Sequence, residues 1–194
     1  MKGLYPTERC DALLVQAPNV VGTMFNLPGV ETPLNLCYIA SYLEKEGGRA
    51  EVFDGALFGD WRAPFEACLR ATRPALLGFA SYTPNVMHAA DMAAFAKKVL
   101  PGVVTVIGGF HASALPERTL REFPSFDYLI AGEPLHFLRV ALGQLQREGR
   151  EGDFALAGLT YREGDRITAN RAPPLLDDLD VLPWPAREKL PLAR

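Results

Sequence analysis

A pair of glycines follows the most apolar stretch in the middle of the sequence. Residues 103–107 read Val-Val-Thr-Val-Ile, and Gly108 and Gly109 come directly after them, before Phe110 and His111. The run is typical of a buried parallel strand, and residues without a Cβ let a ligand or another backbone approach its end. Because ligands of open α/β sheets lie beyond the carboxyl ends of the strands, the pair predicts a binding site. A tight turn between a strand and a helix is the alternative.

Four further strand ends carry small or polar residues. They are Pro18-Asn19, Asp54-Gly55, Ser81-Tyr82-Thr83 and Gly132-Glu133. The carboxyl ends of parallel strands meet at one edge of a sheet, so we expect these groups to lie beside Gly108 and Gly109. The hydroxyl groups of Ser81 and Thr83 could satisfy polar groups of a ligand once they leave water. The sequence therefore predicts one polar edge with a slot between two neighbouring strand ends.

Histidine and cysteine, the usual metal ligands, are few and dispersed. The three cysteines (Cys10, Cys37 and Cys68) form no Cys-x-x-Cys pair, so neither a zinc site nor a disulfide framework is expected. Cys37 and Cys68 lie beside helical apolar stripes, which predicts buried thiols. His88 and His136 are expected on solvated helix faces. His111 is expected either to contact a ligand or to stabilise its loop by a hydrogen bond.

Short apolar runs alternate with helical stripes through most of the chain. Strands are predicted at 11–17, 49–54, 75–80, 103–107 and 126–131, and helices at 33–46, 64–72, 84–100, 114–122 and 134–148. Thr32 is expected to cap the first helix and Pro33 to begin it. This alternation predicts an α/β fold with a doubly wound, five-stranded parallel sheet, flavodoxin-like or Rossmann-like, in the order 2-1-3-4-5.

The pattern changes near residue 150. Residues 159–169 alternate around a turn that contains glycine, which predicts a β-hairpin, and 170–194 are rich in proline and aspartate. We therefore divide the chain into a domain at 1–152 and a hairpin with an extended linker at 153–194. This second segment is not expected to complete the sheet. It is expected to connect to a following domain, to pack against it, and to have little core of its own.

The composition excludes some classes of partner. The 194 residues carry 20 lysines and arginines against 23 aspartates and glutamates, a net charge of -3, and the basic residues form no run. Nucleic acids and anionic membranes bind basic surfaces, so neither is expected as a partner. The first residues lack the apolar core of a signal peptide, and no apolar run is long enough to span a membrane. A cytoplasmic protein is therefore expected.

The residues at the strand ends resemble those of a known cofactor-binding fold. Ser81-x-Thr83 followed by Gly108-Gly109 resembles the Ser-x-Leu and Gly-Gly parts of cobalamin-binding domains, with Thr83 in place of leucine. A closer similarity, to the N-terminal domain of B12-dependent radical SAM enzymes, spans nearly the whole chain. Its motifs are Thr32-Pro-Leu-Asn-Leu36, Ile107-Gly-Gly-Phe-His111-Ala-Ser113, Pro116-Glu117, Gly132-Glu133 and Asp178-Leu-Asp-Val-Leu-Pro-Trp-Pro-Ala-Arg187.

The resemblance implies a cobalamin-binding domain that serves a radical SAM catalytic domain, in cis or in trans, in a methyltransferase or a cyclase. The 4Fe-4S cluster and S-adenosylmethionine would be bound outside this chain, which has no Cys-x-x-x-Cys-x-x-Cys motif, and whether the chain is itself an enzyme stays open. No catalytic residue or protein metal ligand is assigned. The implied cofactor contacts are Pro18, Asn19, Thr32, Ser81, Tyr82, Thr83, Gly108, Gly109, Phe110, His111, Gly132 and Glu133.

Two departures from the family pattern bear on the cofactor. Many cobalamin domains carry Asp-x-His-x-x-Gly after the first strand, and its histidine ligates cobalt, whereas residues 17–22 read Ala-Pro-Asn-Val-Val-Gly. We therefore expect base-off cobalamin, with no protein histidine on cobalt and the nucleotide tail between the strands that end at Ser81 and Gly108. Pro134-Leu135 also replaces the Gly-Glu that usually follows Glu133.

Two other functions stay open. A domain of the same fold that has lost cobalamin would act only as a docking module. A flavodoxin-like binder of FMN or another nucleotide is disfavoured, because no Gly-x-Gly-x-x-Gly follows the first strand.

Overall fold

The computed structural model describes residues 4–19, 32–135, 156–173 and 175–191, and its centre is a seven-stranded sheet. The strands are β1 (Ala12–Gln16), β2 (Ala50–Asp54), β3 (Leu76–Ala80), β4 (Val104–Gly108), β5 (Tyr128–Ile130), β6 (Leu159–Glu163) and β7 (Arg166–Ala169). Their order is β2-β1-β3-β4-β5-β6-β7, and the first five are parallel. The predicted order 2-1-3-4-5 is therefore confirmed for the parallel strands.

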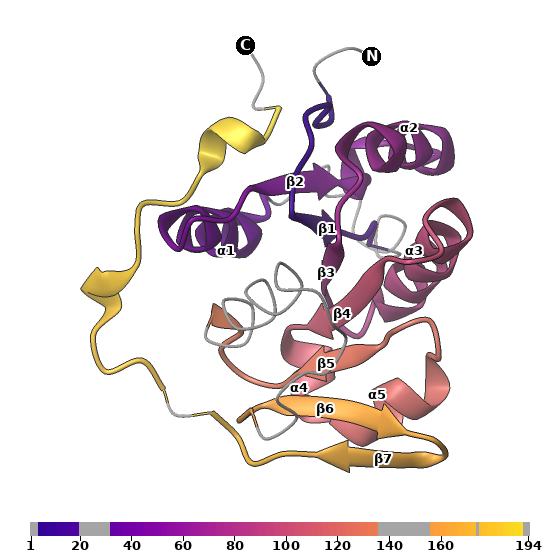
Figure 1. Ribbon diagram of the computed structural model, residues 1–194, viewed down its shortest axis with the longest axis vertical. Helices are drawn as coiled ribbons and strands as arrows, with labels where there is room; N and C mark the ends of the chain where they lie inside the picture. The colour runs from indigo at the N-terminus through magenta and orange to yellow at the C-terminus, as the bar shows by residue number, and fades with distance from the viewer. Residues whose placement is uncertain (1–3, 20–31, 136–155, 174, 192–194) are drawn as a thin grey trace.

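Helices cover both faces of the sheet, which gives three layers (Figure 1). α1 (Leu34–Lys45) packs on one face, where its buried residues join a core with Leu14, Val52 and Val106. α2 (Arg62–Thr72) and α3 (Val86–Val99) pack on the other face, and α5 (Pro116–Glu122) adds Leu120 to the core there. β1 lies between these two cores and all its residues are buried, as expected for a nearly continuous apolar run.

The ends of the helices differ in detail from the predictions. Thr32 does not cap α1: Pro33 occupies the cap position, no side chain caps the helix, and the exposed Thr32 lies one residue too far away. The helix predicted at 114–122 is two short helices, α4 (Phe110–Ala114) and α5, because Leu115 leaves the helical conformation before Pro116. The predicted helix at 134–148 falls almost wholly outside the described residues.

The predicted hairpin is present, but it continues the sheet. β6 pairs antiparallel with β5, with Leu159 opposite Ile130, and β7 pairs antiparallel with β6. The prediction that this segment does not complete the sheet is wrong. Without β6, the edge of β5 would present unpaired backbone groups, and Leu159 and Thr160 of β6 are buried where they pair with it.

The residues after the hairpin also pack on their own domain. Residues 178–190, which we call the C-terminal strap, run along the outside of α1 in the yellow part of Figure 1. Ala186 and Leu190 are only 3% and 8% exposed and belong to the same core as α1. The expectation that this segment has little core of its own is therefore wrong for these two residues. Among the described residues, no helix is both long and apolar enough to cross a membrane.

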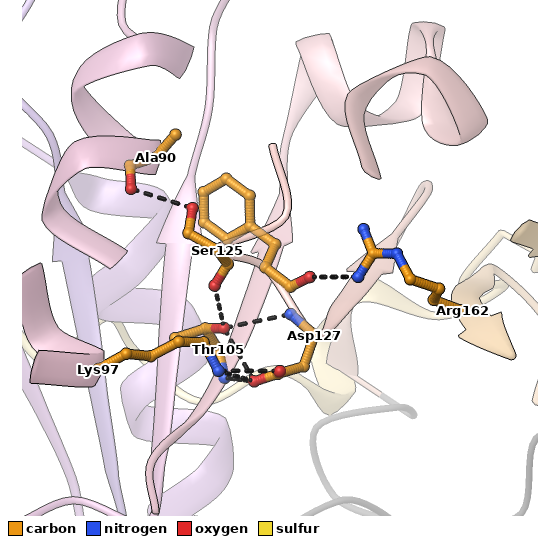
Figure 2. A network of polar contacts seen from close by, with 7 residues as sticks. Ala90, Lys97, Thr105, Ser125, Asp127 and Arg162 are labelled. Atoms are coloured by element: carbon orange, nitrogen blue, oxygen red, sulfur yellow. Dashed lines mark hydrogen bonds and ion pairs between the residues drawn. The ribbon is translucent and has the colours of Figure 1, made fainter. Parts of the chain in front are cut away.

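A polar network on the α3 side ties β4 to β5 (Figure 2). The backbone N–H of Thr105 donates to Asp127 Oδ2 at 2.8 Å, and Asp127 N donates back to Thr105 Oγ1 at 3.2 Å. Lys97 Nζ from α3 lies 2.8 and 2.7 Å from the two oxygens of the same carboxylate. Arg162 of β6 donates to the carbonyls of Leu120 and Phe126. These bonds position β5, the shortest strand of the sheet.

Asp127→Ala should lower the free energy of unfolding by about 2–3 kcal/mol, because it leaves the buried N–H of Thr105 without its acceptor. Lys97→Met is the matched control: its ammonium group is partly exposed, so its loss should cost only about 0.5–1 kcal/mol. Urea unfolding of both variants measures the difference. Equal losses would contradict the role given to Asp127.

Candidate functional site

A cleft of about 570 Å³ lies between the α1 face of the sheet and the carboxyl ends of its strands. Its floor comes from β1, β3, β4 and β5, one wall from α1, and its mouth from the loops that follow β3, β4 and β5. The described lining residues are Leu14, Asn35, Leu36, Tyr38, Ile39, Gly78, Phe79, Ala80, Ser81, Tyr82, Val106, Gly108, Gly109, Phe110, Ser113, Ile130, Gly132, Glu133, Pro134, Leu135 and Leu182.

The floor is hollow because small residues fall on one face of neighbouring strands. Gly78 pairs with Val106, and Ala80 pairs with Gly108 two residues further on. Alternate residues of a strand point to the same face, so these four positions all face the α1 side. A Cβ built on Gly108 would meet only the Ile130 carbonyl oxygen, at 3.6 Å, which leaves the space above it open.

Ser81 locks the end of β3 to the turn after β4. Its backbone N–H and its hydroxyl group both donate to the Gly108 carbonyl, at 2.9 and 2.8 Å, and its own carbonyl accepts from His111 N at 3.3 Å. The Ser81 hydroxyl proton is therefore already used within the protein. The Ser81 oxygen can still accept a hydrogen bond, and the contact of Ser81 with a ligand stays a prediction.

Two aromatic rings stand at the mouth of the cleft. Tyr82 and Phe110 lie with their centroids 5.6 Å apart, and they are 37% and 75% exposed. The buried Asn85 fixes the loop below them, because its Oδ1 accepts from Tyr82 N at 2.8 Å. Together the two rings offer a flat apolar surface to a ligand at the mouth of the cleft.

Thr83 and His111 form a pair outside the cleft. Thr83 Oγ1 lies 3.1 Å from His111 Nδ1, so the expected loop-stabilising hydrogen bond is present, and a contact of His111 with a ligand stays a prediction. His88 is not on a solvated face as expected: it is half-buried, and its Nδ1 donates to the Pro18 carbonyl at 3.0 Å. The side-chain position of His136 lies outside the described residues.

The loop after β5 closes the other side of the mouth. Gly132 has φ +79° and its N–H donates to Ser113 Oγ at 2.9 Å, so α4 fixes this turn. Glu133 is exposed and is the one charged side chain among the described residues that line the cleft.

The structure brings most of the predicted site residues together. Ser81, Tyr82, Gly108, Gly109, Phe110, Gly132 and Glu133 line the cleft. The other five, Pro18, Asn19, Thr32, Thr83 and His111, are not among the described residues that line it.

Sequence reasoning missed the floor and the α1 wall. Gly78 lies in the middle of β3, where glycine weakens a strand, and this signal of a close approach was present in the sequence. Asn35, Tyr38 and Ile39 lie on α1 and line the cleft, although the apolar positions of α1 read only as a core stripe. Leu182 comes from the C-terminal strap, and no local pattern identifies it.

All three cysteines are buried free thiols, as predicted for Cys37 and Cys68. Burial raises the pKa of Cys10 and of Cys68 to about 12, and it also raises the pKa of Cys37. Burial likewise raises the pKa of Asp54 at the end of β2. The hydrogen bond that its carboxylate accepts from Ala56 N lowers this pKa, but by less than burial raises it. In the described parts of the chain, no three histidine, cysteine or acidic residues are grouped so that they could hold a metal ion.

Similar solved structures share this architecture. A radical S-adenosylmethionine methyltransferase, TsrM from Kitasatospora setae, superposes with a TM-score of 0.69 over 82% of this chain and 30% of its own, at 19% identity. The cobalamin-dependent S-adenosylmethionine radical enzyme OxsB, with aqua-cobalamin and S-adenosylmethionine bound, gives 0.70 over 87% and 23%, also at 19% identity. At this identity the likeness shows the fold.

Two relatives found by sequence align with most of this chain. An uncharacterized methyltransferase of Pyrococcus horikoshii is 29% identical over 160 residues, 82% of this chain and 34% of its own length. The anaerobic magnesium-protoporphyrin IX monomethyl ester cyclase of Rubrivivax gelatinosus is 26% identical over 166 residues, 84% and 30% respectively. The chain thus spans about a third of the length of these relatives. The model of the B12 binding domain matches residues 20–139, more than half of the chain, and the chain therefore belongs to the B12-binding domain family.

Proposed function

We propose that the chain binds cobalamin base-off, with the nucleotide tail in the cleft and no protein histidine on the cobalt. The observation that carries the proposal is the open floor at Ala80 and Gly108, where a Cβ on Gly108 would meet only the Ile130 carbonyl oxygen at 3.6 Å, whereas Leu14 fills the space above Gly78. A long arm that ends in a flat aromatic base needs a deep slot that is free of side chains, and this slot opens at the carboxyl ends of parallel strands, where ligands of such sheets bind.

The lining suggests a role for each part of the cleft. Leu14, Val106 and Ile130 would surround the flat aromatic end of the tail, and Tyr82 with Phe110 would contact the corrin at the mouth. The Ser81 oxygen and the backbone of the turn at 108–109 would meet the polar linker of the tail, while Glu133 would accept from amide or hydroxyl groups. Cobalamin supplies the organometallic chemistry when bound, and these residues hold and orient it.

The described histidines support the absence of a cobalt ligand from the protein. Neither His88 nor His111 is among the described residues that line the cleft, and their Nδ1 hydrogen bonds to Pro18 and to Thr83 hold each ring in the fold. The segment after β1, where other cobalamin domains carry the ligating histidine, has none between Ala17 and Gly22.

The chain would act with a radical SAM domain, in cis or in trans, that holds the 4Fe-4S cluster and S-adenosylmethionine. Its sequence relatives include a methyltransferase and a cyclase, and the matched part of this chain covers only 34% and 30% of their lengths. Exposed apolar side chains near the C-terminus support contact with such a domain. Leu175, Leu179 and Trp184 are 81%, 68% and 91% exposed. The division at residue 152 and a cytoplasmic location stay predictions.

Aqua-cobalamin added to the chain should bind with at least roughly micromolar affinity, about -8 kcal/mol, and its absorption spectrum should change to that of the base-off form. Spin resonance of the Co(II) form should show no nitrogen ligand on cobalt. FMN and NAD, added in parallel, should leave the thermal midpoint unchanged, whereas cobalamin should raise it.

Each alternative gives a different result. A nitrogen signal on Co(II), or a spectrum with the tail still on cobalt, would contradict the base-off proposal. Stabilisation by FMN would favour the flavodoxin-like alternative. Binding of none of the three ligands would favour a docking module.

A further inference from the structure

The C-terminal strap is fixed to α1 and β2 at three points. Lys45 Nζ donates to the Val181 carbonyl at 2.8 Å, and Ala186 N donates to the Cys37 carbonyl at 3.2 Å. Lys189 Nζ lies 2.7 Å from Glu44 Oε1 and 3.2 Å from Glu51 Oε1. Along the strap, the contacts on α1 thus go from Lys45 in its last turn to Cys37 in its first turn and back to Glu44 in its last turn.

The Lys189 anchor is more than a surface ion pair. Its side chain is only 11% exposed. Burial opposes the charge, but the hydrogen bonds and charges of Glu44 and Glu51 hold the pKa of Lys189 above its usual value. If the ammonium group were removed, two neighbouring carboxylates would face each other without a cation.

Leu182 lies between these anchors and lines the cleft. It is half-buried, whereas its neighbours Val181 and Trp184 point outward and are exposed. The strap thus has an inner side, with Leu182, Ala186 and Leu190, and an outer side. The cleft wall at Leu182 is contributed by a residue 43 positions beyond the part of the chain that the family model matches.

We propose that the C-terminal strap is part of the cofactor site, with Leu182 as a positioning residue that closes the cleft beside α1 against the nucleotide tail of cobalamin. The inference rests on the proposed function, because it takes the occupant of the cleft from it. A wall that is already fixed when the ligand arrives costs less ordering on binding, so the anchors of the strap contribute to affinity from outside the cleft. By linkage, cobalamin should in turn stabilise the docked strap.

Lys189→Met tests the inference at a distance from the cleft. The change keeps most of the aliphatic stem, removes both ion pairs, and alters no residue that lines the cleft. We expect the dissociation constant for aqua-cobalamin, measured by absorption titration of the full chain, to rise about tenfold, which corresponds to about 1.4 kcal/mol. Arg70→Met is the matched control: it removes the 2.7 Å ion pair to Glu66 on α2, across the sheet, and should leave the constant unchanged.

Leu182→Ala tests the wall directly and does not touch an anchor. It should weaken cobalamin binding by about threefold to tenfold, while Leu182→Met, which keeps the volume, should bind nearly as well as the original chain. Hydrogen exchange adds a readout that a purely structural role would not move: cobalamin should slow exchange of the Ala186 amide in the original chain and slow it less in Leu182→Ala.

The outcomes separate the two proposals. Unchanged affinity in both Lys189→Met and Leu182→Ala, with cobalamin still bound by the original chain, would overturn the role of the strap and leave the proposed function intact. An original chain that binds no cobalamin would overturn both.

Discussion

Gly108→Leu should weaken cobalamin binding by at least about a hundredfold, or about 2.8 kcal/mol, and leave the apo protein folded. The new side chain would leave the sheet on the α1 face, beside Ala80 and Val106, and extend into the hollow floor. Gly108 has an ordinary strand conformation, and its Cβ would lie 3.6 Å from the Ile130 carbonyl oxygen, an acceptable contact. Leucine inside an apolar cleft buries its own surface, so stability should stay equal or rise.

Gly59→Leu is the control for the Gly108 prediction. A Cβ at Gly59 would meet nothing within 4 Å, and this glycine lies outside the cleft. It should bind cobalamin as the original chain does. Absorption titration gives both dissociation constants, and thermal unfolding without cobalamin gives both stabilities. A Gly108→Leu protein that stays folded and still binds cobalamin normally would contradict the placement of the tail in the cleft.

The parallel half of the fold could be predicted because its signals are local. Each parallel strand is a short run of apolar residues bounded by glycine, proline or a polar turn, and α1 ends where Gly47 takes φ +88°. The strand order follows from the alternation of strands and helices and from the handedness of crossovers. No information about distant contacts was needed for these steps.

The antiparallel edge could not be predicted in the same way. The hairpin at 159–169 was visible in the sequence, but its pairing partner was not, because nothing local in β6 specifies β5 rather than another domain. Similarly, Ala186 and Leu190 are buried by α1, which lies about 150 residues earlier in the chain. Proline and acidic residues around them favour an extended segment, but an extended segment can still pack against a helix of the same domain.

The cleft was half predictable for a related reason. Its rim consists of residues that follow strands. Ligands of open α/β sheets bind beyond the carboxyl ends of the strands, and this rule identifies the rim residues from the sequence alone. Its floor depends on register: Ala80 lies beside Gly108, and Gly78 beside Val106, only because β3 and β4 pair as they do. The rule also groups Thr83 and His111 with the rim, whereas they bond to each other outside the cleft.

From the sequence, we assigned Gly108 and Gly109 the same role, to leave room for a ligand, and the structure separates their roles. Gly108 shapes the floor of the cleft, whereas Gly109 makes the turn into α4. Gly109 has φ +98° and ψ -172°, a region that residues with a side chain almost never adopt. A Cβ there would lie 2.6 Å from Ser81 O and 2.9 Å from Ser81 N, and the hydrogen bonds of Ser81 to the same turn prevent these backbone atoms from moving away.

Gly109→Ala should therefore lower the free energy of unfolding by at least about 3 kcal/mol, with or without cobalamin, because backbone strain and a clash with fixed atoms add. Gly108→Ala, one residue earlier, should change the free energy of unfolding by less than about 1 kcal/mol, since its Cβ would make only an ordinary van der Waals contact with the Ile130 carbonyl oxygen. Urea unfolding of the two apo variants compares the same chemical change at adjacent positions. If Gly109→Ala were as stable as Gly108→Ala and lost only cobalamin, Gly109 would belong to the ligand slot and the turn would tolerate a side chain.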